Sequence, residues 1–183
     1  AQPPKWFVGH WWGEPVTSFI VCLEQHARDH KLPEDAAYWV CAYANNQWKL
    51  DEALTDDPGK TSFHQALQIA DGTVSVLDKE GVVFTRVWCG YEIFVSFEDT
   101  KPKPAAEDGP KIEDQPKWKK GDLLPYKWVV YTALEGAKVP AVGLTDGVAP
   151  SEEYAHQKQQ REQHFPLELA QNALGITLET ADA

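Results

Sequence analysis

Residues 5–27 read KWFVGHWWGEPVTSFIVCLEQHA, and this stretch decides the fold class. A short apolar run ends at Gly9, and a loop of polar and aromatic residues follows as far as Pro15, which suits the first turn of a helix. Apolar residues then recur at helical spacing, at Val16, Phe19, Ile20, Leu23 and Ala27. The stretch therefore predicts a strand, a loop and a helix, the first unit of an α/β fold.

The same alternation of strand and helix continues along the chain. Aromatic and β-branched runs predict further strands at residues 38–43, 73–78, 126–134, 141–144 and 176–179. Helical spacing, with Thr61 or Ser62 as a cap, predicts helices at residues 61–70, 82–97, 151–163 and 165–174. Strands that alternate with helices form parallel sheets covered on both sides. We therefore expect a three-layer α/β fold, flavodoxin-like in outline, with a central parallel sheet of about five strands and helices on both faces.

A single domain accounts for the length of the chain. The chain has 183 residues and a mass of 20.5 kDa, which suits one α/β domain over residues 1–183. Lys, Pro and acidic residues alternate at about residues 98–122, where we expect a solvated insertion. Hydrophobic residues make up 43% of the chain and charged residues 25%, so the composition excludes a disordered protein.

Charge and cysteine usage limit the partners and the compartment. Lys and Arg number 17 against 28 acidic residues, and a net charge of −11 argues against nucleic acid as a partner. No apolar run reaches the roughly 18 residues of a membrane span, so we expect no transmembrane segment. Cys22, Cys41 and Cys89 are widely spaced within apolar stretches, which is typical of reduced thiols. We therefore expect an intracellular protein, cytoplasmic in the simplest case, with a plastid as an open alternative.

Polar and aromatic residues gather where the predicted strands end. The loops after parallel strands form the usual ligand crevice of an open sheet, because the carboxyl ends of the strands meet at one edge. Glu92 lies four residues after Trp88, so both share one face near the start of a predicted helix. The plainer interpretation of Glu92 is an acid held by backbone donors at that helix start. The candidate residues of the crevice are His10, Trp11, Trp12, Glu14, Asn46, Arg86, Trp88 and Glu92.

Two motifs resemble those of one known family. Residues 7–14, FVGHWWGE, and the helix after them resemble the opening of Toll/interleukin receptor (TIR) domains, especially of the plant type. Residues 88–92, WCGYE, are similar to the Trp-Cys-x-x-Glu motif of that family at its three fixed positions. Residues 44–47, ANNQ, are shared with uncharacterised TIR-like proteins of unicellular algae. The resemblance covers residues 5–98 and implies a TIR-like fold, with further sheet strands within residues 126–183.

The resemblance also implies an activity. In TIR enzymes the glutamate of this motif cleaves NAD at the bond between nicotinamide and ribose, which assigns Glu92 as the catalytic carboxylate. NAD is then the substrate, and no further cofactor or metal is expected. Nicotinamide leaves as a neutral ring, so the carboxylate has to stabilise an oxocarbenium-like ribose. Trp11 or Trp12 would stack on a base, and Arg86 would meet a phosphate.

A second function, of a different class, stays open. Residues 12–15 read WGEP where the family has Arg-Gly-Glu-Asp, and many TIR domains are adaptors that only self-associate. The alternative is therefore a non-catalytic TIR-like interaction module in signalling, or a structural subunit of a larger assembly. The enzyme predicts an open crevice around Glu92 lined by Trp11, Trp12 and Arg86, whereas the module predicts a closed helix start. An unrelated flavodoxin-like binder of a small anion is the third interpretation.

Three further motifs have plainer interpretations. Residues 57–62 imitate the end of a phosphate loop but lack its first glycine, so we expect a turn and a helix cap. His26 and His30 are spaced for a metal site, but no third ligand stands at a suitable spacing, so we expect an exposed helix face. Cys89 with His10 as base would make a nucleophile, yet a buried and inert thiol is the simpler expectation.

Overall fold

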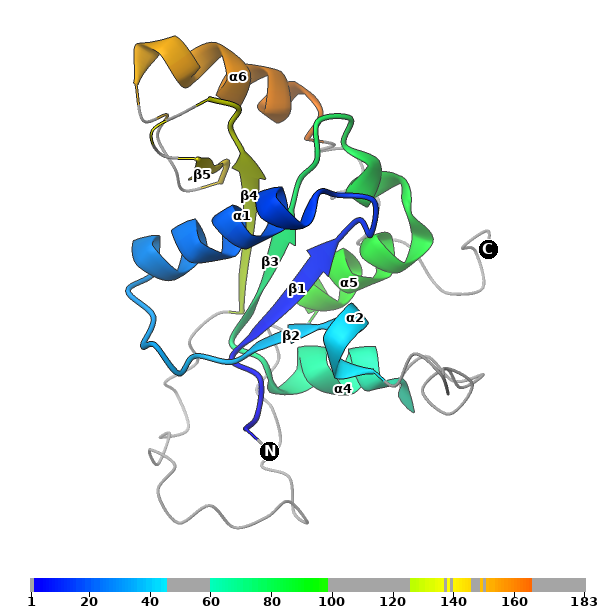
Figure 1. The fold of residues 1–183 in the computed structure, drawn as a ribbon. Helices are drawn as coiled ribbons and strands as arrows, with labels where there is room; N and C mark the ends of the chain where they lie inside the picture. The colour runs from blue at the N-terminus through cyan, green and yellow to red at the C-terminus, as the bar shows by residue number, and fades with distance from the viewer. Residues whose placement is uncertain are drawn as a thin grey trace.

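The computed structural model describes residues 2–45, 60–98, 126–136, 138, 140–145, 149 and 151–165 (Figure 1). Several predictions from the sequence fall outside these residues. They are the candidate Asn46, the insertion from residue 99 onward, the helix beyond residue 165 and the strand at residues 176–179.

The described residues form one five-stranded sheet. Its order is β2-β1-β3-β4-β5, and the pairs β1/β2, β1/β3 and β3/β4 are parallel. Val8 fixes the register at the centre, since it pairs with Val40 on one side and Val74 on the other. The expected α/β class with five strands is confirmed. The strands are β1 (Trp6–His10), β2 (Tyr38–Val40), β3 (Gly72–Val76), β4 (Lys127–Ala133) and β5 (Ala141–Gly143).

One edge of the sheet departs from the expected parallel arrangement. β5 pairs antiparallel with β4, with Thr132 opposite Val142. The chain between the two strands spans only residues 134–140, whereas a crossover to a parallel strand needs about a dozen residues or more. Gly136, with φ of +69°, adopts the left-handed conformation that this turn requires. The central sheet is therefore parallel from β2 to β4, as expected, and β5 is added to its edge in the antiparallel direction.

Helices cover both faces of the sheet, as expected (Figure 1). α1 (Val16–Asp29) packs on one face, where Phe19 and Cys22 meet Trp6 and Val8 of β1. α4 (Ser62–Ile69) and α5 (Val87–Glu98) pack on the other face, around Phe7 of β1. Alternate residues of β1 thus enter two different cores, because successive side chains of a strand point to opposite faces. α6 (Glu152–Gln163) lies beyond the end of β4 (Figure 1).

Two predicted elements are divided in the structure. Residues 38–43 were expected as one strand, but β2 stops at Val40 and Cys41–Ala44 form the short helix α2. The helix expected within residues 82–97 is a 3₁₀ helix, η2 (Val82–Thr85), followed by α5. The extended backbone of Arg86, with ψ of 133°, separates them. By contrast, the predicted cap of α4 is confirmed, since the Thr61 hydroxyl accepts a hydrogen bond from the backbone of His64 at 3.2 Å.

The prediction of an exposed face at His26 is wrong. His26 is fully buried, its ring lies 4.3 Å from that of Trp6, and its Nδ1 lies 2.8 Å from the hydroxyl of Tyr38. It falls on the same helical stripe as Phe19 and Cys22, which faces the sheet. Burial, with a smaller contribution from His30, lowers the pKa of His26 to about 3, so the ring is neutral at physiological pH.

Cys22, Cys41 and Cys89 are thiols rather than disulfides, with Cys22 and Cys89 buried and Cys41 half-buried. Within the same part of the chain, none of the helices has both the length and the hydropathy to span a membrane.

Candidate functional site

The strand order creates a switch point between β1 and β3. The connection from β1 leads through α1 to β2 on one side, and the connection from β3 leads through α5 to β4 on the other. Ligands of open α/β sheets bind beyond the carboxyl ends of the strands at such a point. His10 closes β1 there, and Asp78 follows β3 by two residues. The residues around these two positions define the candidate site.

Glu92 reaches this point from the α5 face of the sheet. A Cβ atom built on Gly9 would lie 2.8 Å from Oε2 of Glu92 and 3.5 Å from the hydroxyl oxygen of Ser75. The carboxyl group thus occupies the space that any side chain at residue 9 of β1 would need. Gly9, which marks the end of an apolar run in the sequence, is what admits the carboxyl group against the strand backbone.

The surroundings of Glu92 disfavour a charge. The residue is only 7% exposed, and no described residue donates a hydrogen bond to its carboxyl oxygens. Burial raises the pKa of Glu92 to about 8, and the cationic Arg86 only partly opposes this. At neutral pH the group is therefore mostly protonated. Buried carboxyl groups with strongly raised pKa values concentrate at functional sites.

Arg86 and Trp88 stand at the start of α5. Arg86 is exposed at the extended residue before the helix. Trp88 is 40% exposed, stacks on Phe63 of α4 at 5.8 Å and meets Tyr91 edge to face at 6.1 Å. The thiol of Cys89 is buried, and burial together with the nearby Glu92 raises its pKa, as expected for an inert thiol. His10, the base that a Cys89 nucleophile would need, lies on the other face of the sheet, against Phe19.

The loop after β1 sends its residues in different directions. The backbone N–H of Glu14 donates to the carbonyl of Trp11 at 3.0 Å, which leaves Trp12 at the tip, 57% exposed. Trp11 instead packs against the cluster that contains Leu77, Phe84 and Cys89. His10 turns to the α1 face, where its ring lies 4.7 Å from that of Phe19, and burial lowers its pKa.

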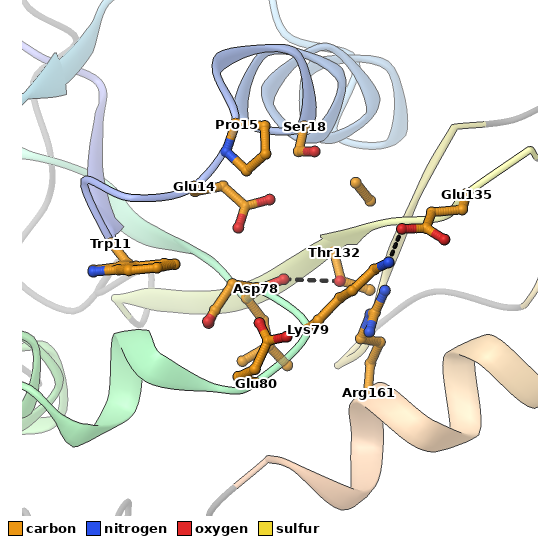
Figure 2. Close-up of a pocket in the computed structure, with 12 residues that line it drawn as sticks. Trp11, Glu14, Pro15, Ser18, Asp78, Lys79, Glu80, Thr132, Glu135 and Arg161 are labelled. Atoms are coloured by element: carbon orange, nitrogen blue, oxygen red, sulfur yellow. Dashed lines mark hydrogen bonds and ion pairs between the residues drawn. The ribbon is translucent and has the colours of Figure 1, made fainter.

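A cavity of about 250 Å³ opens on the α1 side of the switch point. It lies between the start of α1, the ends of β3 and β4, and α6 (Figure 2). Its charged side chains are Glu14, Asp78, Lys79, Glu80, Glu135 and Arg161, and Trp11 contributes a ring to the wall. Lys79 and Glu135 form an ion pair with each other.

Glu14, Asp78 and Glu135 of this cavity have partners, whereas no described residue donates a hydrogen bond to the carboxyl group of Glu92. Burial and the neighbouring Asp78 raise the pKa of Glu14, while a hydrogen bond from the Ser18 hydroxyl lowers it. Burial raises the pKa of Asp78, and the backbone N–H of Val82, at 2.7 Å, opposes that shift. Besides Lys79, the cavity is lined by the cation Arg161, whose pKa is lowered by burial and raised by the surrounding carboxylates. The cavity thus combines both signs of charge.

The structure places the candidate site residues predicted from the sequence on two different faces of the sheet. Trp11 and Glu14 join the cavity on the α1 side, whereas Glu92 lies with Gly9 and Ser75 on the α5 side. Trp12, Arg86 and Glu92 do not line the cavity that Trp11 lines. No three His, Cys, Asp or Glu side chains among the described residues are grouped as metal ligands.

Arg161 is the residue that sequence reasoning missed. It is the buried residue of α6, a helix that is otherwise polar on all sides. Without an apolar stripe the sequence gives no sign of which face of α6 turns inward.

No protein-family model, curated protein or solved structure matches this chain. The likeness to TIR domains therefore stays a prediction from the motifs at residues 7–14 and 88–92.

Proposed function

We propose that this protein is a TIR-type glycohydrolase that cleaves NAD between nicotinamide and ribose, with Glu92 as the catalytic carboxylate. The observation that carries the proposal is the carboxyl group of Glu92, buried without a hydrogen-bond donor from the described residues at the switch point of the sheet. The similarity of residues 88–92 to the Trp-Cys-x-x-Glu motif supports the same assignment.

The chemistry suits a carboxyl group in this environment. The nicotinamide ring of NAD is cationic, and a cation beside Glu92 lowers the pKa of the carboxyl group and drives its ionisation. As the glycosidic C–N bond breaks, its electron pair neutralises the ring, and positive charge moves to the ribose. The Glu92 carboxylate then stabilises the oxocarbenium-like ribose by charge and by accepting hydrogen bonds from ribose hydroxyls. Water adds to the sugar and releases a proton, which gives ADP-ribose and nicotinamide.

Exposed side chains around the start of α5 supply the remaining contacts. Arg86 offers a guanidinium group to a phosphate, next to the positive end of the helix dipole. Trp12 and Trp88 each expose a ring on which a base can stack. His10 lies on the opposite face of the sheet, against Phe19, and we assign it no contact with the substrate.

The alternative function is a non-catalytic TIR-like interaction module or a structural subunit, and one observation favours it. An aromatic row runs from the core to the surface through Phe7, Trp39, Phe63 and Trp88, whose neighbouring rings lie 4.9 to 5.8 Å apart. It ends in the exposed Trp88, and on α2 the ring of Tyr43 is 75% exposed. Exposed aromatic rings anchored in a core are typical of protein interfaces.

The test is NAD consumption with analysis of the products. Wild type, Glu92→Gln and the control Glu24→Gln, which changes an exposed acid of α1, are compared at high protein concentration, where assembly is favoured. We expect nicotinamide release by wild type and by the control, and a loss of about 100-fold or more in Glu92→Gln. The kcat/KM of wild type should rise with pH and level off above about 8, because it reports the pKa of Glu92 in the free enzyme.

Two results contradict the proposal. Release that persists in a folded Glu92→Gln variant removes Glu92 from the reaction. No release by folded wild type at assembling concentrations favours the interaction module.

A further inference from the structure

The cavity on the α1 side has room for a small organic molecule. Its volume of about 250 Å³ corresponds to about eight water molecules at their share of liquid volume. Figure 2 shows Glu14 and Asp78 on one side of the cavity and Arg161 reaching up from α6 on the other. The indole ring of Trp11 lies at one end of the cavity.

Arg161 is an unsatisfied donor in this cavity. The residue is 8% exposed, and its Nε has no hydrogen-bond partner. Glu14, Asp78 and Glu80 are near enough to affect its pKa, yet none of the ion pairs among the described residues includes its guanidinium group. Leaving a buried donor unpaired costs free energy, so an acceptor that enters from solvent would be bound favourably.

The carboxyl groups opposite have acceptor capacity to spare. Glu14 receives a hydrogen bond from Ser18, and Asp78 receives one from the backbone of Val82, whereas two carboxylates together offer about eight acceptor positions. Each carboxylate is also destabilised by the charge of a neighbouring carboxylate. A cation between them would relieve this repulsion.

We propose that this cavity binds a small zwitterion of α-amino-acid chemistry. Its carboxylate accepts hydrogen bonds from Arg161, and its ammonium group donates to Glu14 and Asp78. Its side chain lies against the apolar part of the wall, which Trp11 and Leu77 provide. A simple amine leaves Arg161 unpaired, and a simple anion meets the repulsion of the carboxylates, so only a ligand with both charges satisfies the two sides.

The experiment is calorimetric titration of the full chain with two matched sets of probes. The first set is L-leucine, 3-methylbutylamine and 4-methylpentanoate, and the second is L-phenylalanine, phenethylamine and 3-phenylpropionate. Within each set the side chain is constant, and one charge is removed at a time. We expect an amino acid to bind at least about tenfold more tightly than either of its singly charged analogues, since each analogue loses a charge-assisted contact.

Variants locate the site and keep the proposal falsifiable. Arg161→Gln should abolish the advantage of the amino acid over the amine, and Glu14→Gln should abolish its advantage over the acid. Arg28→Gln, at an exposed arginine of α1, should leave binding unchanged. If Arg161→Gln does not fold, the wild-type probe series and Glu14→Gln decide.

Three results overturn the proposal. One is the absence of binding by every probe at about 10 mM, where even a millimolar ligand is seen. Another is equal binding of an amino acid and its amine, which would make the cavity a cation site. The third is binding that is unaffected by Glu14→Gln. The inference does not depend on NAD cleavage, so either can fail alone.

Discussion

Carboxyl groups lie on both faces of the sheet at the same edge, where Asp78 and Glu92 are buried and Glu14 is half-buried, and their surroundings differ. On the α1 face, Glu14 and Asp78 have donors from Ser18 and from the backbone of Val82 and share the charge of Arg161. On the α5 face, Glu92 has no donor among the described residues. The difference teaches that burial alone does not set the role of an acid. Hydrogen bonds lower the pKa values of Glu14 and Asp78 against the effect of burial, whereas burial without a donor from the described residues raises the pKa of Glu92 to about 8.

The largest expected effect is on the pH dependence of stability. Unfolded Glu92 loses its proton near pH 4.5, whereas folded Glu92 keeps it up to about pH 8. The free energy of unfolding of wild type therefore falls as the pH rises between these values, by about 4 to 5 kcal/mol in total. Above pH 8 this loss of stability no longer grows. Glu92→Gln removes this loss, so its free energy of unfolding, measured with urea, should exceed that of wild type by a growing margin from pH 5 to 8.

If the difference in free energy of unfolding between Glu92→Gln and wild type stays constant over this pH range, Glu92 is already ionised in the folded protein, through solvent or a partner. Glu24→Gln, at an exposed acid, serves as the control and should follow wild type throughout.

The next effect distinguishes two glycines near Glu92. A Cβ atom at Gly9 would lie 2.8 Å from Oε2 of Glu92, whereas one at Gly90 in α5 meets nothing within 4 Å. Gly9→Ala should destabilise the protein by about 1 to 3 kcal/mol and displace the carboxyl group. Gly90→Ala should stabilise it by up to about 1 kcal/mol, because alanine favours a helix. Thermal unfolding measures both, and equal effects at the two positions would contradict the placement of Glu92.

On the α1 face, removal of a buried carboxyl group should lower the stability of the protein, whereas replacement of Glu92 should raise it. Asp78→Ala removes the acceptor for the N–H of Val82 at the start of η2, and we expect a loss of about 1 to 2 kcal/mol in the free energy of unfolding. Urea denaturation at pH 7 checks this value. A gain in stability on removing Asp78, as expected for Glu92, would end the distinction between the two faces.

The smallest expected effect on stability concerns the interaction between Ser18 and Glu14 on the α1 face. Ser18→Ala removes the donor to Glu14, with an expected cost of about 0.5 to 1 kcal/mol at pH 7. The hydrogen bond favours ionised Glu14, so the cost should shrink as the pH falls and Glu14 becomes protonated in both proteins. A cost that does not change with pH would mean that Ser18 acts through packing alone.

Most of the fold is predictable from local sequence, because spacing and capping act over a few residues. The strand at Trp6–His10, the helix at Val16–Asp29 and the cap at Thr61 all follow from such patterns. The failures arise where distant residues decide. The antiparallel edge at β5 depends on the length of a turn, and the burial of His26 depends on which stripe of α1 meets the sheet.

The sequence by itself determined the α/β class and marked Glu92, through the motif at residues 88–92 and the alternation of strands and helices. Only the tertiary structure decided that Glu92 lies against Gly9 with no donor from the described residues, and that Arg161 faces Glu14 and Asp78 across a cavity. The physical reason is that periodicity reports which residues avoid water. The pairing of buried charges depends on which elements the folded sheet brings together, and that is not a local property of the chain.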